Sequence, residues 1–422
     1  MAKKRASKQN VKSYHESQKL HQHKRNGLEQ PTEDHLFLPP AFPRTKDLLM
    51  PTTGFLRNEG ICTKAFQVAL DTTYEGFAYD TSSSEQGDGE IFPHTEIQKS
   101  LLVMDGAGLF RADVTQPFGL GTKCAKTYVT RCLLGDEGTT YKYLGLRMFS
   151  HPWNGNVLYG NKVLKEAIGA IAKLNETLTD RAKAHLKDLE QKRLRRGICP
   201  PVIKGRVAFD VALINKMQST SELKLEPMFH NERCSVSWHA DSSLEHYSTI
   251  AVYHTITGQQ NKKDARVNDS TSSGDCDWSV ALRVVHNAEG PAASRRGADI
   301  SSSIAAENPP IAISLSSGSA YYMLDDHNHH HQHAVIAPKE GNPGVRFSST
   351  HRLLREGHTV QFIIGRCAAA CANFHRKGPK LWRSEQLLLL EIEFEWLRQF
   401  YIQGEEHKTL LWKVSLQHCR RF

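Results

Sequence analysis

The chain has 422 residues, of which 39% are hydrophobic and 23% are charged, a composition that excludes fibrous and wholly disordered proteins. This length predicts one large domain with extensions, or two domains. The net charge of +9 favours polyanionic partners, and the 22 histidines raise the question of a metal. No apolar run approaches the roughly 20 residues of a membrane helix, and the charged N-terminus has no apolar signal segment, so we expect neither a membrane partner nor secretion.

The first segment in chain order is basic, because lysines and arginines recur between Lys3 and Arg25 among few apolar residues. Such a segment cannot bury enough surface to offset the entropy lost on ordering, so we predict a disordered arm over residues 1–35. We interpret the arm either as a nuclear address or as a plain solvated tail. The first interpretation predicts a nuclear protein, with the cytoplasm as a second location.

A long helix is predicted over residues 161–195. Its apolar residues recur at three- and four-residue steps and form one stripe. The stripe consists of Leu164, Ile168, Ile171, Leu174, Leu178, Ala182, Leu186 and Leu189. The cations at the end of the helix, among them Arg193, precede Gly197, where positive charge suits the helix dipole and glycine suits the C-cap. A phosphate contact is the second interpretation of these charges.

Between residues 206 and 354 the pattern changes to eight short, β-rich segments separated by polar turns. The predicted strands are 206–214, 234–238, 248–256, 278–285, 311–315, 319–324, 333–337 and 346–353. Eight short strands with polar insertions predict a β-sandwich or a jelly roll.

Beyond Gly357 the pattern is helical again, with Thr359 as a candidate N-cap and a second helix predicted over residues 385–403. The nine cysteines are scattered, odd in number and without a C-x-x-C pair, so we expect reduced thiols and no structural zinc. We therefore predict a main domain over residues 36–356 and a short C-terminal helical extension over residues 357–422.

An H-x-D pair lies at the end of the second predicted strand. In a strand, His239 and Asp241 would face the same side and could chelate one ion. His333, at the head of an apolar strand, is the candidate third ligand. Two histidines and one carboxylate that leave adjacent positions open form the facial triad of non-haem Fe(II) oxygenases. H-x-D is a short motif, however, and taken alone it is more simply explained as a surface pair.

Four further histidines precede the candidate ligand at 333, and they are His327, His329, His330 and His331. A histidine tract is typical of a metal scavenger or of a solvated loop. Because only His333 opens a predicted strand, we interpret the other four as loop residues.

A second motif is the sequence RFSSTHR, which starts at Arg346. In an extended strand Arg346, Ser348 and Arg352 share one face. Arginine binds carboxylates bidentately and is always charged, so this pair can anchor a dicarboxylate such as 2-oxoglutarate. Two buried arginines require an acid, and Asp325 or Asp326 is the alternative partner.

These motifs carry a resemblance to the FTO-type branch of the AlkB-like Fe(II)/2-oxoglutarate dioxygenases, whose signature is H-x-D…H…R-x5-R. The matching segments are residues 140–144, 234–241, 321–333, 346–352 and 393–400, within a region of about residues 100–410. The resemblance implies an α+β fold with a double-stranded β-helix (jelly roll) core, flanking helices and a truncated C-terminal helical extension.

Carried over residue by residue, the resemblance gives the Fe(II) ligands as His239, Asp241 and His333. It gives the 2-oxoglutarate site as Arg346, Ser348, Arg352, Asn215 and Tyr321. It gives the base pocket as Arg131, Tyr141, Tyr143 and Leu144. In that pocket the arginine would contact the methylated base and the other residues would form the walls. The two tyrosines are also compatible with one face of an ordinary strand.

The resemblance implies oxidative N-demethylation of methylated bases in RNA or single-stranded DNA, with N6-methyladenine as the first choice. Fe(II), 2-oxoglutarate and O2 would be required, and formaldehyde, succinate and CO2 would be released. Ala240 and Ser242 replace polar and acidic residues of the family's animal members, so we expect an altered or relaxed base preference. The alternatives are a 2-oxoglutarate-dependent protein hydroxylase and a catalytically silent nucleic-acid-binding module. The sequence predicts no oligomeric state.

Overall fold

The computed structural model describes residues 56–57, 63–81, 91–112, 129–143, 146–153, 161–197, 208–220, 223–226, 232–257, 278–284, 310–338, 344–377 and 383–397. The chain divides into two compact units, and every described residue belongs to the second unit, Pro43–Phe422. The predicted basic arm lies outside the described residues, as does the predicted extension after residue 397.

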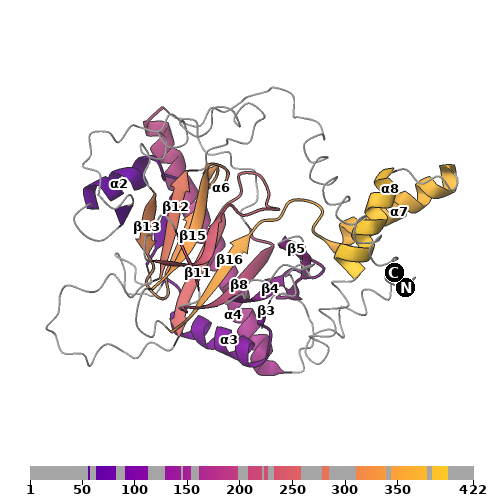
Figure 1. The fold of residues 1–422 in the computed structure, drawn as a ribbon, viewed down its shortest axis with the longest axis horizontal. Helices are drawn as coiled ribbons and strands as arrows, with labels where there is room; N and C mark the ends of the chain where they lie inside the picture. The colour runs from indigo at the N-terminus through magenta and orange to yellow at the C-terminus, as the bar shows by residue number, and fades with distance from the viewer. Residues whose placement is uncertain are drawn as a thin grey trace, which may run out of the picture. The chain divides into compact units, whose positions relative to one another are not determined.

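Two facing sheets form the centre of this unit (Figure 1). The larger sheet has the order β2 (Phe77–Asp80), β14 (Ala320–Met323), β11 (Ile250–Thr257), β16 (Val345–Arg352), β8 (Val211–Gln218), β4 (Val129–Gly135), β3 (Arg111–Ala112), with β7 (His151–Pro152) beside β4. The smaller sheet has the order β1 (Leu56–Arg57), β13 (Ile311–Ser314), β12 (Ser279–Val284), β15 (His331–Ala337), β10 (Arg233–His239), β9 (Lys224–Leu225). A separate hairpin is formed by β5 (Thr140–Tyr143) and β6 (Leu146–Phe149).

The strands from β8 to β16 form the predicted jelly roll. Strands β8, β11, β14 and β16 lie in the larger sheet, and β10, β12, β13 and β15 lie in the smaller one. The neighbouring pairs within these two sets are antiparallel, and the chain passes repeatedly from one sheet to the other. This is the topology of a double-stranded β-helix, and the predicted fold class is confirmed.

All eight predicted strands are present, although the first is shifted along the chain. It was predicted over residues 206–214 and is observed as β8, Val211–Gln218. The polar residues that follow Ile214 still pair with β16. Asn215 faces the space between the sheets, and Lys216 forms an ion pair with Asp105 at 2.6 Å. Polar residues therefore continue a strand that apolar patterning alone would end.

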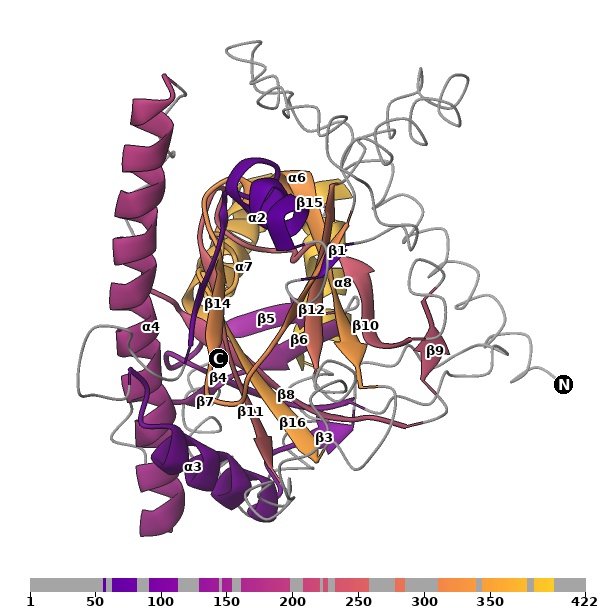
Figure 2. The same cartoon turned by 90° about the vertical axis from the view of Figure 1, so that its left-hand side faces the viewer.

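The space between the sheets holds one apolar core, which contains Leu213, Val252 and Tyr321 from the larger sheet with Val280 and Leu282 from the smaller. The side chains that alternate with these on the larger sheet belong to a second core on the opposite face. Two helices, α3 (His94–Gly106) and α4 (Lys162–Arg195), cover that outer face (Figure 2). A third helix, α2 (Thr63–Thr72), precedes β2.

Helix α4 confirms the predicted helix and its stripe, because all eight apolar residues of the stripe are buried. The helix begins after Asn161, whose side chain accepts hydrogen bonds from the backbone N–H groups of Val163 and Leu164. Farther along, Asp80 of β2 accepts hydrogen bonds from Arg181, His185 and Tyr322. The helix is thus attached to the edge of the larger sheet by polar as well as apolar contacts.

Arg193 lies in the last turn of α4, as predicted, but it is buried, and the helix dipole alone does not account for its charge. Its guanidinium binds Glu75 at 2.8 Å, Asp325 at 2.8 Å and Asp326 at 2.9 Å. The two aspartates follow β14, which ends beside this turn of the helix. Three carboxylates compensate the cost of burying one guanidinium.

Strand β10 is irregular where it pairs with β15. Cys234 packs on the outer face of the smaller sheet, whereas Val236 packs between the sheets. Three residues later, His239 lies opposite His333, and the register shifts twice along the way. Such shifts are typical of β-bulges, which reset the alternation of side chains. His239 therefore faces the same side as Val236 despite the odd spacing.

The C-terminal helices are α7 (Val360–Lys377), α8 (Arg383–Glu391) and the π-helix η4 (Ile392–Leu397). The predicted cap is confirmed, because Thr359 Oγ1 accepts a hydrogen bond from the Phe362 N–H at 3.2 Å. Trp396 of η4 packs against the β5–β6 hairpin through Phe149, and Arg147 of that hairpin lies 4.2 Å from the Trp396 ring. None of the helices in the described part of the chain is long and apolar enough to span a membrane.

A buried polar group joins α4 to the outer face of β16. His351 Nδ1 lies 2.6 Å from Asn175 Oδ1, and its Nε2 lies 2.8 Å from Ser349 Oγ. Burial, together with the nearby positive charge of Arg352, lowers the pKa of His351 to about 3. This imidazole is therefore neutral at physiological pH.

His351 should make the fold sensitive to acid. Unfolded histidine takes up a proton near pH 6.5, whereas folded His351 takes one up only near pH 3. Its stabilising contribution is therefore complete above pH 6.5 and is lost as the pH falls, by about 2 kcal/mol at pH 5. Urea unfolding at pH 7.5 and pH 5 should show a smaller loss for His351→Gln than for the wild type. Equal losses in the two proteins would contradict this assignment.

Candidate metal centre

His239, Asp241 and His333 converge where β10 and β15 pair. The rings of His239 and His333 lie with their centroids 4.1 Å apart. Asp241 follows the end of β10, and the donor atoms of all three side chains lie within 4.8 Å of one another. Among the residues that the structure describes, this is the only group of three or more His, Cys, Asp or Glu side chains placed to hold a metal ion.

Hydrogen bonding and burial prepare these three side chains as ligands. His239 Nδ1 lies 2.8 Å from the carbonyl oxygen of Ser237, which can only accept, so Nδ1 carries the proton and Nε2 is available to a metal. Burial lowers the pKa of His333 to about 3, so this imidazole is neutral. Burial alone would raise the pKa of Asp241, but Arg352 and the two histidines bring it below its ordinary value. Two imidazoles and one carboxylate fit the donor set of a non-haem Fe(II) site.

Arg352 lies against the carboxylate of Asp241. Its Nε donates to Oδ2 at 2.9 Å and its Nη2 donates to Oδ1 at 2.8 Å, and its guanidinium lies 5.1 Å from the centroid of the Tyr141 ring. The structure therefore brings Arg352 to the metal centre by way of Asp241. A bidentate pair of this kind fixes the orientation of the carboxylate that would bind the metal.

Arg346 lies in a different electrostatic setting, because no carboxylate of a described residue is within 4.0 Å of it. The side chain is fully buried, and its Nε and Nη1 contact His254 Nδ1 at 3.3 Å and Met217 Sδ at 3.1 Å. Its Nη2 has no hydrogen-bond partner among the described residues. Burial lowers the pKa of Arg346, and the nearby Tyr321 hydroxyl opposes that effect. A buried cation with an unused donor fits an anionic ligand.

The alternative acid partners suggested for the two arginines are wrong. Asp325 and Asp326 both bind Arg193 of α4, on the other side of the larger sheet from Arg346 and Arg352. The aspartates follow β14 into the turn beside α4, whereas the two arginines face the space between the sheets. The two aspartates are close to the arginines in the sequence but separated from them in the fold. This separation depends on where α4 packs, which the sequence pattern does not predict.

The remaining predicted cosubstrate residues face the same interior space, as does Arg131, which was predicted for the base pocket. Arg131, Asn215 and Ser348 are direct neighbours across β4, β8 and β16, so they share one face of the larger sheet. That face also carries Arg346 and, from β14, the buried Tyr321. The fold therefore brings together residues that are up to 217 positions apart, which is the difference between 348 and 131.

The predicted walls of the base pocket are described only in part. Tyr141 is buried with 2% of its surface exposed, and its hydroxyl donates to the carbonyl oxygen of Ser242 at 3.3 Å. Tyr141 thus supports Arg352 and the segment after Asp241, and it has no broad face open to solvent. Leu144 and the side chain of Tyr143 lie outside the described residues.

The interpretation of the histidine tract as a solvated loop is wrong. His327–His330 form a short helix, α6, and His331 is the first residue of β15. His327 and His331 are buried and stacked, with ring centroids 4.3 Å apart, and burial lowers the pKa of both. The tract packs because neutral imidazoles can be buried beside Tyr74 and Phe77.

His254 is a site residue that the sequence analysis missed. It is fully buried in β11 and contacts Arg346 through Nδ1. A single histidine inside an apolar strand is compatible with an ordinary core position, which is why the pattern did not single it out. Its place opposite Ser348 in the strand register was the missing information.

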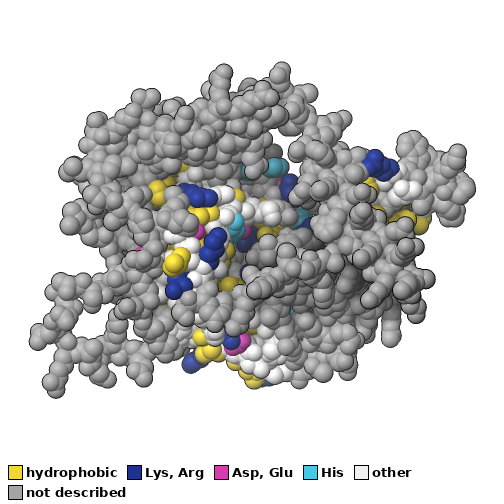
Figure 3. All heavy atoms as spheres, in the orientation of Figure 1, with side chains coloured by type: hydrophobic (Ala, Val, Ile, Leu, Met, Phe, Trp, Pro, Cys, Tyr) yellow, Lys and Arg dark blue, Asp and Glu magenta, His cyan; other side chains and the backbone are white. Residues whose placement is uncertain are grey.

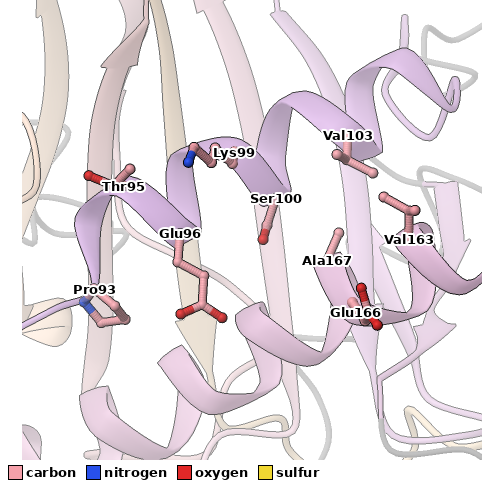
Figure 4. Close-up of a pocket in the computed structure, with 9 residues that line it drawn as sticks. All are labelled: Pro93, Thr95, Glu96, Lys99, Ser100, Val103, Val163, Glu166 and Ala167. Carbon is pink, nitrogen blue, oxygen red and sulfur yellow. The ribbon is translucent and has the colours of Figure 1, made fainter.

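Two surface features can be described besides this centre. Histidine, lysine and arginine side chains are visible on the face drawn in Figure 3. A groove of about 540 Å³ lies between α3 and α4, where Glu96 and Glu166 extend into it (Figure 4). None of the residues that line the groove belongs to the metal centre or to its neighbours.

Comparison with known proteins gives a consistent set of relatives. A family model of the FTO catalytic domain matches residues 64–355. The alpha-ketoglutarate-dependent dioxygenase FTO of Xenopus laevis is 30% identical over 362 residues, which cover 76% of this chain and 66% of the relative. The chain therefore spans 66% of the length of that curated relative.

Solved structures give more distant matches. The structure of OsALKBH1 has a TM-score of 0.34 and 14% identity, covering 66% of this chain and 97% of that one. An oxidoreductase of the 2OG-Fe(II) oxygenase family from Burkholderia pseudomallei has a TM-score of 0.33 and 13% identity, covering 72% of this chain and 98% of that one. At these TM-scores neither match bears on the site.

Proposed function

Since the chain belongs to the FTO catalytic-domain family of alpha-ketoglutarate-dependent dioxygenases, we propose that it removes N-methyl groups oxidatively from bases in RNA or single-stranded DNA. The first base to test is N6-methyladenine. The observation that carries the proposal is the convergence of His239, Asp241 and His333 near a buried arginine that lacks a carboxylate partner among the described residues. Metal ligands and an anion site would thus both border the space between the two sheets.

The three converging side chains would hold Fe(II). Bound with 2-oxoglutarate and O2, the iron supplies the oxidising chemistry that an N-methyl group requires. His239 and His333 would each contribute a ring nitrogen. Asp241 would contribute a carboxylate oxygen, and the two hydrogen bonds from Arg352 fix the orientation of that carboxylate. The protein therefore supplies ligation and orientation, and no separate acid–base pair is needed.

Arg346 would bind the carboxylate of 2-oxoglutarate that is remote from the metal. Its Nη2 is buried and available, and Ser348 lies two residues away on the same face of β16. A guanidinium can bind a carboxylate through two parallel hydrogen bonds, which defines the orientation of the dicarboxylate. Tyr321, whose hydroxyl already affects the pKa of Arg346, would form part of the same site.

Three observations support a nucleic-acid substrate. Arg131 lies on the same interior face as the cosubstrate residues, the chain has a net charge of +9, and basic side chains are visible on the face drawn in Figure 3. A methylated base must leave its stack to enter an interior site, and single strands offer such bases at the lowest cost. Ala240 and Ser242 are exposed beside the metal ligands, which supports a relaxed base preference.

The proposal is tested by incubating the full chain with Fe(II), 2-oxoglutarate and O2 and a panel of methylated RNA and DNA oligonucleotides. Formaldehyde release together with loss of the methyl mark is the expected result. Methylated or unmodified peptides in the same assay test the alternative of a protein hydroxylase. If the chain forms an anaerobic Fe(II)–2-oxoglutarate complex but acts on no oligonucleotide, the proposed substrate class is wrong. If no such complex forms, the chain is a silent binding module.

Arg131 should determine which base is oxidised. Replacing it with alanine removes a charged donor from the interior face of β4, so kcat/KM on a methylated oligonucleotide should fall by about 10- to 100-fold. Decay of 2-oxoglutarate in the absence of substrate should continue, because the metal centre is untouched. Arg233→Ala, on the smaller sheet, serves as the control. Unchanged discrimination between methylated and unmethylated bases would remove this role.

A further inference from the structure

Asp241 is the one candidate metal ligand that lies outside a strand. Strand β10 ends at His239, so the ladder with β15 no longer holds the backbone at position 241. The following residues turn away, and Ser243 and Tyr247 have positive φ angles of 66° and 58°. A ligand in such a segment needs another means of support.

The side chain of Asn328 provides that support. Its Oδ1 accepts a hydrogen bond from the Asp241 N–H at 2.9 Å, and its Nδ2 donates to the Asp241 carbonyl oxygen at 2.9 Å. An amide side chain offers one acceptor and one donor in a plane, which matches the N–H and C=O of a single residue. Asn328 thus takes the place that a neighbouring strand would occupy in an antiparallel ladder.

Asn328 is itself held rigidly, because it belongs to α6 and α6 is fixed at both ends. Before it, Asp325 and Asp326 bind the buried Arg193 of α4. After it, His331 Nε2 lies 2.9 Å from the carbonyl oxygen of Thr73. The buried His327 and His331 thereby pack the helix that presents Asn328 to Asp241.

A second contact ties the same helix to the segment beyond the ligand. His329 Nε2 accepts a hydrogen bond from the Tyr247 N–H at 3.2 Å, and the two rings lie with their centroids 4.8 Å apart. Helix α6 therefore holds both ends of residues 241–247. Arg352, at the end of β16 in the larger sheet, holds the Asp241 carboxylate at 2.8 and 2.9 Å.

We propose that Asn328 is a positioning residue for the metal centre, which acts by fixing the backbone of Asp241. With the main chain held by Asn328 and the carboxylate held by Arg352, the ligand oxygen is kept close to His239 and His333 before any metal binds. This assignment rests on the proposed function, since it requires the three side chains to bind a metal. Residues that orient a ligand typically change metal affinity by about 10- to 100-fold when they are replaced.

The experiment compares metal binding by the full chain and its variants, prepared free of metal and titrated anaerobically with Co(II) and with Fe(II) plus 2-oxoglutarate. Asn328→Ala should weaken Co(II) binding by about 10- to 100-fold and diminish the Fe(II)–2-oxoglutarate absorption band. Asn328→Leu is similar in size to the wild-type residue and favours a helix, so it keeps the packing of α6 and removes only the two hydrogen bonds. It should show the same loss.

Asn175→Ala is the matched control. Asn175 is also half-buried, and its amide binds His351 and the Phe209 carbonyl, away from the metal centre. This variant should lower the unfolding temperature but keep the Co(II) affinity of the wild type. Wild-type affinity in both Asn328 variants, or an equal loss of affinity in Asn175→Ala, would overturn the assignment. The titration of the wild-type protein reports separately on the proposed function, which fails if that protein itself binds no metal.

Discussion

Replacing His239 with alanine should weaken Fe(II) binding by more than about 100-fold and abolish turnover. The substitution removes a metal ligand, and replacing a residue that only orients a ligand already lowers metal affinity by about 10- to 100-fold. The fold should persist, since the side chain is 35% exposed and lies at the last residue of β10. Nucleic-acid binding should also persist, because phosphate contacts do not involve the metal. Anaerobic Fe(II) titration, demethylation and oligonucleotide binding measured on one preparation would check all three results.

His246→Ala is the matched control for this experiment. His246 is an exposed histidine in the segment that follows the metal ligands, and its ring stacks on His329 at 5.6 Å. Its removal should leave Fe(II) affinity and turnover at the wild-type values. Retention of turnover by His239→Ala would exclude His239 as an iron ligand, and equal losses in both variants would point to a general disturbance of the segment.

Arg346→Met should have two opposite effects, on cosubstrate binding and on the stability of the ligand-free protein. Binding of 2-oxoglutarate should weaken by about 30-fold or more, because truncating one partner of a buried charge pair costs at least about 2 kcal/mol. The ligand-free protein should become more stable by roughly 1 kcal/mol, since a fully buried cation without a carboxylate partner among the described residues is replaced by an apolar side chain.

Thermal unfolding with Mn(II) in place of iron measures both effects. At a 2-oxoglutarate concentration of about 100 times the wild-type Kd, the wild type should gain about 2.7 kcal/mol and the variant about 1 kcal/mol or less. Arg283→Met is the control. The Arg346 guanidinium lies 5.5 Å from the Trp278 ring, and that of Arg283 lies 4.5 Å from the Trp238 ring, but on the outer face of the smaller sheet. A full ligand-induced gain in Arg346→Met would exclude Arg346 as the anchor.

The sequence predicted the jelly roll well because its strands are locally encoded. Most of the eight segments are short β-branched or apolar runs bounded by polar turns, and α4 carries an uninterrupted stripe with a glycine at its end. Helix α3 was not predicted. Its buried Ile97, Leu101 and Met104 have helical spacing, but Leu102 is 47% exposed and Val103 is only partly buried, so the apolar run 101–104 does not form one clear stripe.

The candidate site was predictable only in those features that depend on the spacing of residues within one strand. The spacing of H-x-D and the alternation along RFSSTHR place side chains relative to their own strands. The partner of each arginine was not predictable in this way. Arg352 meets Asp241 across 111 positions, and Arg193 takes Asp325 across 132 positions, because partners so distant are chosen by the packing of whole elements.

Asn328 is another site residue that the sequence could not identify. It lies within a histidine tract, and neither its residue type nor its spacing distinguishes it from a loop asparagine. Its partner is the backbone of Asp241, and a backbone leaves no signature in the pattern of side chains. Asn328 reaches Asp241 only because β15, which follows α6, pairs with β10.

The irregular pairing of β10 has a consequence for how this segment tolerates changes of length. Val236 and His239 lie opposite Val335 and His333, so β10 carries one residue more than its partner over this stretch. Removing Trp238 would leave regular pairing and would keep the histidine directed between the sheets. Removing Ala240 would instead make the two ligands adjacent, and adjacent residues of an extended chain point to opposite sides. A library of single-residue deletions should therefore retain metal binding at the first position and lose it at the second, although the two positions are neighbours of the same histidine.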